Sequence, residues 1–215
     1  MTLCRCTGCM RPAISDVENG KLISADFCYK HHPEQNKIVE RLLNYVKENE
    51  KIVGMNASGL TFSGVHLYEK KFYGCNFRYC FLINIQTEKI RTRLTAFDFA
   101  IFTDCNFIKS VNINSSFAGA KFIHVIYTDS EQIQVNFSGL QSYQSSFDNS
   151  NLYQSRFIKA NLVDTSFRNC NLKRTIFYEL NQTNISFRLS NTKEAIFDKR
   201  GSELFLGESK DGGIM

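Results

Sequence analysis

Residues 155–177 read SRFIKANLVDTSFRNCNLKRTIF, and this stretch decides the fold. A large apolar residue recurs at every fifth position from Phe157 to Phe177, and a small residue stands two positions before each of them. A period of five matches neither an α-helix, which repeats about every 3.6 residues, nor a continuous strand, which alternates about every 2. It is typical of a chain that turns a corner after every five residues, with two inward side chains on each side.

The same phase runs from residue 62 to residue 197 without an insertion or deletion. Of its 28 positions, 21 hold Phe, Leu or Tyr, and we call all 28 the large slots. Four sides make a coil of 20 residues, so that residues twenty apart should stack as a repeat core. One such column is entirely Phe: Phe77, Phe97, Phe117, Phe137, Phe157, Phe177 and Phe197.

Single units such as Cys75-Asn76-Phe77-Arg78-Tyr79 and Ala160-Asn161-Leu162-Val163-Asp164 resemble the pentapeptide-repeat family. The family's unit is a small residue, then Asn or Asp, then Leu or Phe, then two variable residues. The resemblance covers about two thirds of the chain. It implies an all-β fold, a right-handed quadrilateral β-helix of about seven coils, which we expect over residues 60–200.

Seven large slots are polar, and four of them lie on one side of the coil, which we call the third side: Thr92, Asn112, Gln132 and Thr192. One explanation is an outward apolar strip with basic ends, suited to an acidic partner. This candidate interaction surface comprises Arg91, Arg93, Ile113, Ile133, Tyr153, Lys173 and Arg174. The other explanation is a local slip, in which Ile113 and Ile133 turn inward and push Asn112 and Gln132 outward.

The first 32 residues have a different chemistry, because they hold Cys4, Cys6, Cys9, Cys28 and His31. The other four cysteines occupy small inward positions of repeats and are interpreted as buried small side chains: Cys75, Cys80, Cys105 and Cys170. In the front group, Cys28 and His31 form one pair, and Cys9 forms another with Cys4 or Cys6. Thiolate and imidazole ligands suit tetrahedral zinc, and four protein ligands indicate a structural site rather than a catalytic one.

The order of elements supports a zinc-binding module over residues 1–32. An Asn19-Gly20 turn between apolar residues predicts a hairpin. Pro33 then suits the first turn of a helix, and residues 34–50 show helical periodicity. A knuckle, a hairpin and a helix whose start supplies two ligands are similar to the treble-clef order. We assign residues 33–59 to a helix that caps the rod and to a linker.

The string from Cys4 to Ala13, followed by Phe27-Cys28 and His31, also resembles small zinc modules found beside phage-type nucleases and DNA-binding proteins. This resemblance favours Cys4 over Cys6 as the first ligand, so that Cys6 is the likeliest spare residue. The hairpin here is longer than in those modules.

Residues 201–215 are rich in Gly and charge and are interpreted as a mobile tail. Phe205 and Leu206 within it are candidates to cap the far end of the rod or to make a homodimer contact. No run of about 18 apolar residues exists, and the start lacks a signal-peptide core, so we expect a cytoplasmic protein without a membrane span.

An enzyme is not expected, because His66 and His124 lie at outward repeat positions and no Gly-rich phosphate loop appears. Three binding functions compete. The first is a scaffold for a protein partner with a structural zinc site. The second is a DNA mimic that binds gyrase or topoisomerase, as some family members do, although that requires an acidic surface and this rod is basic. The third is nucleic-acid binding through the zinc module and the basic side, which a net charge of +5 supports only weakly.

Overall fold

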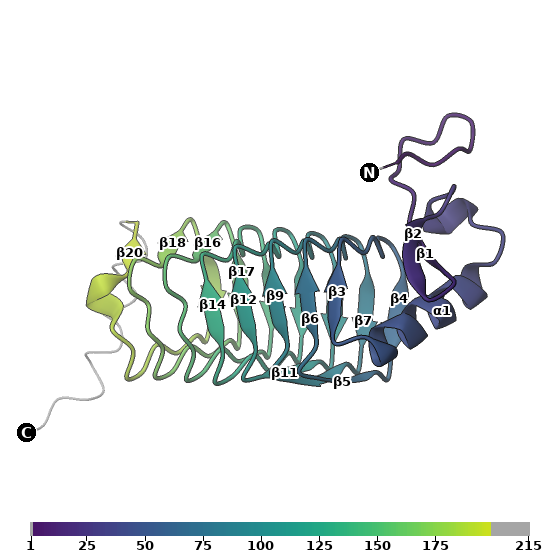
Figure 1. Cartoon of the computed structure of the whole chain (residues 1–215). Helices are drawn as coiled ribbons and strands as arrows, with labels where there is room; N and C mark the ends of the chain where they lie inside the picture. The colour runs from purple at the N-terminus through teal and green to yellow at the C-terminus, as the bar shows by residue number, and fades with distance from the viewer. Residues whose placement is uncertain (1, 199–215) are drawn as a thin grey trace, which may run out of the picture.

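The computed structural model describes residues 2–198, and Figure 1 shows a long rod of parallel strands with a smaller unit and a helix at its N-terminal end. The predicted fold class is confirmed. The chain is a four-sided parallel β-helix preceded by a module containing a Cys/His cluster and by one α-helix. Phe205 and Leu206, the candidates for a far-end cap or a dimer contact, lie outside the described residues.

The rod has four sides, numbered in the order in which the chain passes them. A seven-stranded sheet forms the first side: β4 (Thr61–Ser63), β7 (Phe81–Ile83), β10 (Ile101–Thr103), β13 (Lys121–Ile123), β15 (Gln141–Tyr143), β17 (Asn161–Val163) and β19 (Asn181–Thr183). The second side holds β5 (His66–Tyr68), β8 (Gln86–Glu88) and β11 (Asn106–Ile108). The third side holds β3 (Lys51–Val53), β6 (Lys71–Tyr73), β9 (Arg91–Arg93), β12 (Val111–Ile113) and β14 (Glu131–Ile133). The fourth side holds isolated bridges, then β16 (Arg156–Ile158), β18 (Ile176–Tyr178) and β20 (Ile196–Phe197).

Each residue of the rod pairs with the residue twenty positions away. Phe102 of β10 lies beside Leu82 on one flank and Phe122 on the other. The corners between sides use the left-handed backbone region, which non-glycine residues such as Tyr79 and Phe99 adopt with φ of 59° and 58°. Backbone groups of one coil therefore find their partners in the next coil, and only the two ends of the rod need separate capping.

Aromatic rings fill the interior as the sequence predicts. In the all-Phe column, neighbouring rings are stacked with centroids 4.7 Å apart for Phe97 and Phe117 and for Phe137 and Phe157. The small inward positions lie between such columns. Cys80 is fully buried and its thiol donates to the carbonyl oxygen of Ala57 at 3.0 Å. Burial raises the pKa of the Cys80 thiol to about 12, so this cysteine is a packing residue rather than a ligand.

Three polar large slots of the third side, Thr92, Asn112 and Gln132, point inward, and the slip hypothesis is wrong. Asn112 and Gln132 are both fully buried, whereas Ile113 and Ile133 are half-buried at outward positions. The register holds because the buried amide of Asn112 finds partners: its Nδ2 donates to Tyr127 OH at 2.7 Å and to Gln132 Oε1 at 3.0 Å. Hydrogen bonds thus offset the cost of keeping polar side chains inside the rod.

The rod begins earlier than residue 60, the start expected from the sequence. β3 already pairs in parallel with β6, with Ile52 beside Phe72. Ile52 and Ala57 are both fully buried and continue the phase of the large slots backwards. The small Ala57 hides this phase in the sequence, so residues 51–59 belong to the first coil and are not a linker.

Helix α1 (Gln35–Glu48) covers the N-terminal end of the rod (Figure 1). Its buried face consists of Ile38, Leu42 and Val46, which belong to the same hydrophobic core as Ile52 and Met55. An apolar cavity of about 60 Å³ remains between the helix and the first coils. It lies where the second-side column holds the short side chains of Leu67 and Thr87 in place of the rings found further along.

Candidate metal centre

The first pair of cysteines is presented by a tight loop at the start of the module. The amide of Cys9 donates to the carbonyl oxygen of Cys6 at 3.0 Å, and the amide of Cys4 donates to the carbonyl oxygen of Arg11 at 2.9 Å. Gly8 adopts a φ of 77° in this loop. The loop thereby folds back on itself and brings Cys4 and Cys9 to one side.

The second pair follows the hairpin of β1 (Ser15–Glu18) and β2 (Lys21–Ser24). Asn19 and Gly20 at its tip have φ of 50° and 71°, the left-handed pair that the Asn-Gly sequence predicts. The short 3-10 helix η1 (Tyr29–His31) comes next, and the amide of His31 donates to the carbonyl oxygen of Cys28 at 3.0 Å. This turn places Cys28 and His31 side by side.

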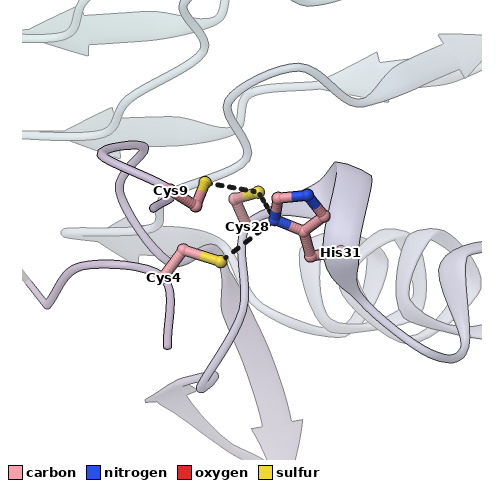
Figure 2. Close-up of side chains that lie close together, drawn as sticks. All are labelled: Cys4, Cys9, Cys28 and His31. Carbon is pink, nitrogen blue, oxygen red and sulfur yellow. Dashed lines mark hydrogen bonds between the residues drawn. The ribbon is translucent and has the colours of Figure 1, made fainter. Parts of the chain in front are cut away.

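Figure 2 shows that the side chains of Cys4, Cys9, Cys28 and His31 converge on one point. The Sγ atoms of Cys9 and Cys28 are 3.8 Å apart, and Nδ1 of His31 lies 3.4 Å from Cys4 Sγ and 3.6 Å from Cys28 Sγ. All four ligand atoms lie within 4.8 Å of one another. These four residues can hold a metal ion.

The spacing agrees with tetrahedral coordination. Bonds of about 2.3 Å to sulfur and about 2.0 Å to nitrogen, at tetrahedral angles, separate two sulfurs by about 3.8 Å and a sulfur from a nitrogen by about 3.5 Å. The distances between Cys9 and Cys28 and between His31 and the two thiols match these values.

The electrostatics of the cluster also favour a cation. Burial raises the pKa of Cys4, but hydrogen bonds from the backbone of Cys28 and Cys6 and from the His31 side chain outweigh it and lower that pKa to about 6. Burial, together with the neighbouring Cys4 and Cys9 thiols, raises the pKa of Cys28. The Cys4 thiol thus ionises readily, whereas the Cys28 thiol beside it does not, because two neighbouring thiolates would repel each other. A bound cation removes this repulsion by stabilising both thiolates.

Cys6 lies outside the converging group, although its backbone shapes the loop. His32 also faces away from the cluster: its Nδ1 accepts from the amide of Glu34 at 3.1 Å, and its Nε2 lies 3.9 Å from Asp16. The structure therefore brings together four of the five predicted ligands and selects Cys4 where the sequence left Cys4 and Cys6 open.

Direct hydrogen bonds fasten the module to the first coil. Asn56 is buried, and its Nδ2 donates to the carbonyl oxygen of Ala13 at 2.6 Å. Ser15 and Asn56 exchange two further hydrogen bonds of 2.7 Å and 2.9 Å. Arg41 of α1 forms a bidentate pair with Asp16, with distances of 2.7 Å and 2.8 Å. The segment around Ser15 thereby closes the open edge of the fourth side.

Five residues of the candidate interaction surface form a continuous column on the third side, whereas Arg91 lies in the column of Val111 and Arg174 at a corner. Backbone pairing aligns Arg93, Ile113 and Ile133 along the rod, and Tyr153 and Lys173 continue the line through Gln134 and Gln154. Lys173 lies 3.6 Å from Glu194. The column is half-buried in the middle and exposed at both ends.

The fold and the cluster together define a β-solenoid with a candidate metal module. The family model described as "Pentapeptide repeat region" matches residues 120–197 of the rod. The same twenty-residue register runs back without a break to β3. No curated protein matches the sequence.

Solved structures are similar to this chain over about three quarters of its length. QnrB1, described as a plasmid-mediated fluoroquinolone resistance protein, is 12% identical over 76% of this chain and 100% of its own, with a TM-score of 0.38. Rfr23 from the cyanobacterium Cyanothece 51142 is 13% identical over 74% of this chain and 99% of its own, with a TM-score of 0.36. HetL from Nostoc sp. strain PCC 7120 is 11% identical over 74% and 97%, with a TM-score of 0.23. At sequence identities and TM-scores this low, the functions of these proteins cannot be assigned to this chain.

Among residues 2–198, no helix has the length and apolar character needed to cross a membrane.

Proposed function

We propose that this protein is a non-enzymatic binding scaffold whose N-terminal module is folded around one structural zinc ion. The observation that carries the proposal is the convergence of the ligand atoms of Cys4, Cys9, Cys28 and His31, three pairs of which have tetrahedral spacing. Three thiolates and one imidazole fill a four-coordinate shell, so no position remains for water or substrate. Zinc in such a site supplies folding free energy rather than chemistry.

The surface histidines support a binding role rather than a catalytic one. His124 is exposed, and its ring nitrogens lie 2.9 Å from Asp104 Oδ1 and 2.8 Å from Gln144 Oε1. Asp104 and Gln144 are its neighbours in the same corner column, twenty residues away on each side. Hydrogen bonds to the carboxylate of Asp104 and to the amide oxygen of Gln144 raise the pKa of His124. This histidine thus links successive coils and has no nucleophile as its partner.

The third side is the surface we propose for a protein partner. Its column joins apolar side chains at Ile113 and Ile133 to cationic ends at Arg93 and Lys173. A strip of this kind, half-buried in the middle and exposed at its ends, suits a partner with an apolar centre and acidic flanks. Its basic ends argue against DNA mimicry, which requires a surface of the opposite charge.

Metal content of the purified protein tests the structural site. We expect about one zinc per chain, and Cys4→Ser should reduce this by removing a ligand. Cys6→Ser is the matched control, since Cys6 lies outside the cluster, and it should retain zinc. Less than about half an equivalent of zinc in the unmodified protein would contradict the proposal.

Partner capture tests the interaction surface separately. A variant with Arg91, Arg93, Lys173 and Arg174 replaced by Ser keeps every inward residue of the rod and removes the cationic ends of the column. We expect it to lose the proteins that the intact chain retains in a pull-down. An unchanged set of captured proteins would rule out the third side.

A further inference from the structure

A cleft of about 540 Å³ lies between the module and the rod. This volume is in the range of sites that hold small organic ligands, about 300–1,000 Å³. Both parts of the molecule contribute to its walls: Arg11, Pro12, Cys28, Tyr29 and Lys30 from the module, and Ser58, Gly59, Asn76, Arg78, Tyr79 and Phe81 from the rod.

An exposed aromatic stack reaches into this cleft from the rod. Tyr79 and Phe99 occupy one corner column, and their rings are stacked with centroids 5.3 Å apart and planes 8° apart. Both are more than half exposed, at 57% and 54%. The neighbouring Phe81 is also exposed. These rings lie outside the hydrophobic core, and exposed apolar groups that gather in one place mark an interaction site.

The two ends of this stack differ. Beyond Phe99, the column continues with Gly119, and a Cβ there would lie 2.6 Å from the Phe99 ring, so the ring covers that position. Before Tyr79, the column holds Gly59, where a Cβ would meet nothing within 4 Å. Because coils stack along one axis, the face of Tyr79 opposite Phe99 looks toward Gly59 and the cleft. One stacking position is therefore open on the cleft side.

The walls of the cleft are cationic, since Arg11, Lys30 and Arg78 line it and no acidic residue does. Arg78 is held in place by Asp98, which accepts from its Nε at 2.8 Å. Within residues 2–198, neither Arg11 nor Lys30 takes part in an ion pair. The backbone of both residues is fixed by the Cys/His cluster. Arg11 lies two residues after Cys9, and Lys30 lies in η1 between Cys28 and His31.

We propose that this cleft binds single-stranded nucleic acid. An unpaired base stacks on Tyr79 in the open position at Gly59 and extends the Tyr79–Phe99 stack by one ring. Arg11, Lys30 and Arg78 contact the phosphates that flank this base. Aromatic platforms beside a basic groove are how proteins hold single strands, because every base has a stacking face and every linkage carries a charge. Duplex DNA fits the cleft less well because its bases are already stacked and paired. An acidic peptide fits less well because it rarely carries an aromatic ring beside each negative charge.

The inference rests on the proposed function, because the module must be folded for Arg11 and Lys30 to face the rod. It goes beyond that function in naming a ligand class and a site. The two can fail independently. A chain without zinc contradicts the structural site, whereas a zinc-loaded chain that ignores nucleic acid contradicts only the cleft.

Fluorescence anisotropy of a labelled twelve-nucleotide oligothymidine, with the zinc-loaded full chain, tests the proposal. We expect saturable binding. The logarithm of the association constant should fall with the logarithm of the salt concentration with a slope of about −2, as for three phosphate contacts. Gly59→Tyr should weaken binding about tenfold, because the new ring occupies the position of the base. The corner tolerates this change, since Tyr79 and Phe99 adopt the same backbone conformation in the same column.

Gly64→Tyr is the matched control. Gly64 lies in the same coil, has a φ of 63°, has nothing within 4 Å of its Cβ position and is outside the cleft. It should bind as the unmodified chain does. Arg11→Ala with Lys30→Ala should weaken binding and reduce the salt slope, with zinc content measured on the same sample.

Four results would overturn the proposal: no binding of the oligonucleotide by the zinc-loaded chain, equal affinities for Gly59→Tyr and Gly64→Tyr, equal affinity for the matching duplex, or equal affinity for thymidine monophosphate. The last would mean that the cleft accepts a free nucleotide and gains nothing from the strand.

Discussion

The module and the rod contact each other, but each is stabilised internally by different interactions. In the module, four ligand atoms and one hairpin organise about thirty residues that bury few large side chains. In the rod, each coil stacks on the next through the same rings and the same backbone pairing. Damage at one point should therefore abolish the order of the module, whereas the rod shares its stability among many equivalent contacts.

Removal of the metal should produce the largest difference between the two regions. Structural zinc contributes about 10–16 kcal/mol in small zinc-binding peptides, far more than the module's own core can replace. With a strong chelator, we expect amide hydrogen exchange to become fast over residues 2–12 and 26–32 and to stay slow in the rod. Helix α1 should also stay protected, because Ile38, Leu42 and Val46 pack into the core of the rod.

If the chelator left the exchange of the module unchanged, the cluster would not be holding the fold. Loss of protection throughout the rod would instead show that the module, and not only α1, is needed to close the first coil.

Removing one ring from the rod should have the next largest effect. Phe137 is fully buried and stacks between Phe117 at 5.3 Å and Phe157 at 4.7 Å. Phe137→Ala should lower the free energy of unfolding by about 3–5 kcal/mol through lost burial and the cavity left behind. Urea denaturation followed by circular dichroism measures this, with Phe81→Ala as the control, since Phe81 lies on the surface. Equal losses for the two variants would refute the stacked core.

The buried polar network of the rod should contribute less. Asn112 links Tyr127 and Gln132 and also accepts from the hydroxyl of Thr92. Asn112→Ala leaves these groups unpaired in the interior and should cost about 2 kcal/mol. Asn181→Ala, at an exposed position of β19, should cost little by the same denaturation measurement. A neutral Asn112→Ala would mean that water or rearrangement satisfies the network.

The smallest effect should come from the ion pair that joins the module to α1. Burial raises the pKa of Asp16, but hydrogen bonds from Arg41 and from the amide of Val17 outweigh it, and that pKa lies below its ordinary value of 3.8. A lowered carboxyl pKa stabilises the folded state above the ordinary value, and this stability is lost as the pH falls through the folded pKa. Arg41→Ala should therefore cost about 1 kcal/mol at pH 7 and less with increasing acidity.

Thermal unfolding of both proteins from pH 7 to pH 3 gives this difference, and metal release at low pH affects both proteins alike. A gap in stability that stayed constant down to the lowest pH would assign the cost to lost packing of the Arg41 stem rather than to its charge.

The period of five was enough to predict the rod, because each large slot reports a buried position directly. It failed where one residue broke the pattern: Ala57 concealed the first coil, and the polar Asn112 suggested a slip that its hydrogen bonds make unnecessary. Ligand spacing predicted the Cys/His cluster but left Cys4 and Cys6 open, since only the folded loop shows which thiol joins Cys28 and His31. The cleft was not predicted, because Arg11 and Lys30 belong to the module, and the repeat pattern does not say where the module packs against the rod.

The quarter-turn geometry of the corners limits how the length of such a protein can change. Deletion of five residues inside the rod would rotate every downstream surface by a quarter turn relative to the metal module, and the strip on the third side would be split between two sides. Deletion of twenty residues would shorten the rod by one coil and leave each column facing its former direction. Growth or loss by whole coils is therefore the only change in length inside the rod that keeps each downstream column facing its former direction.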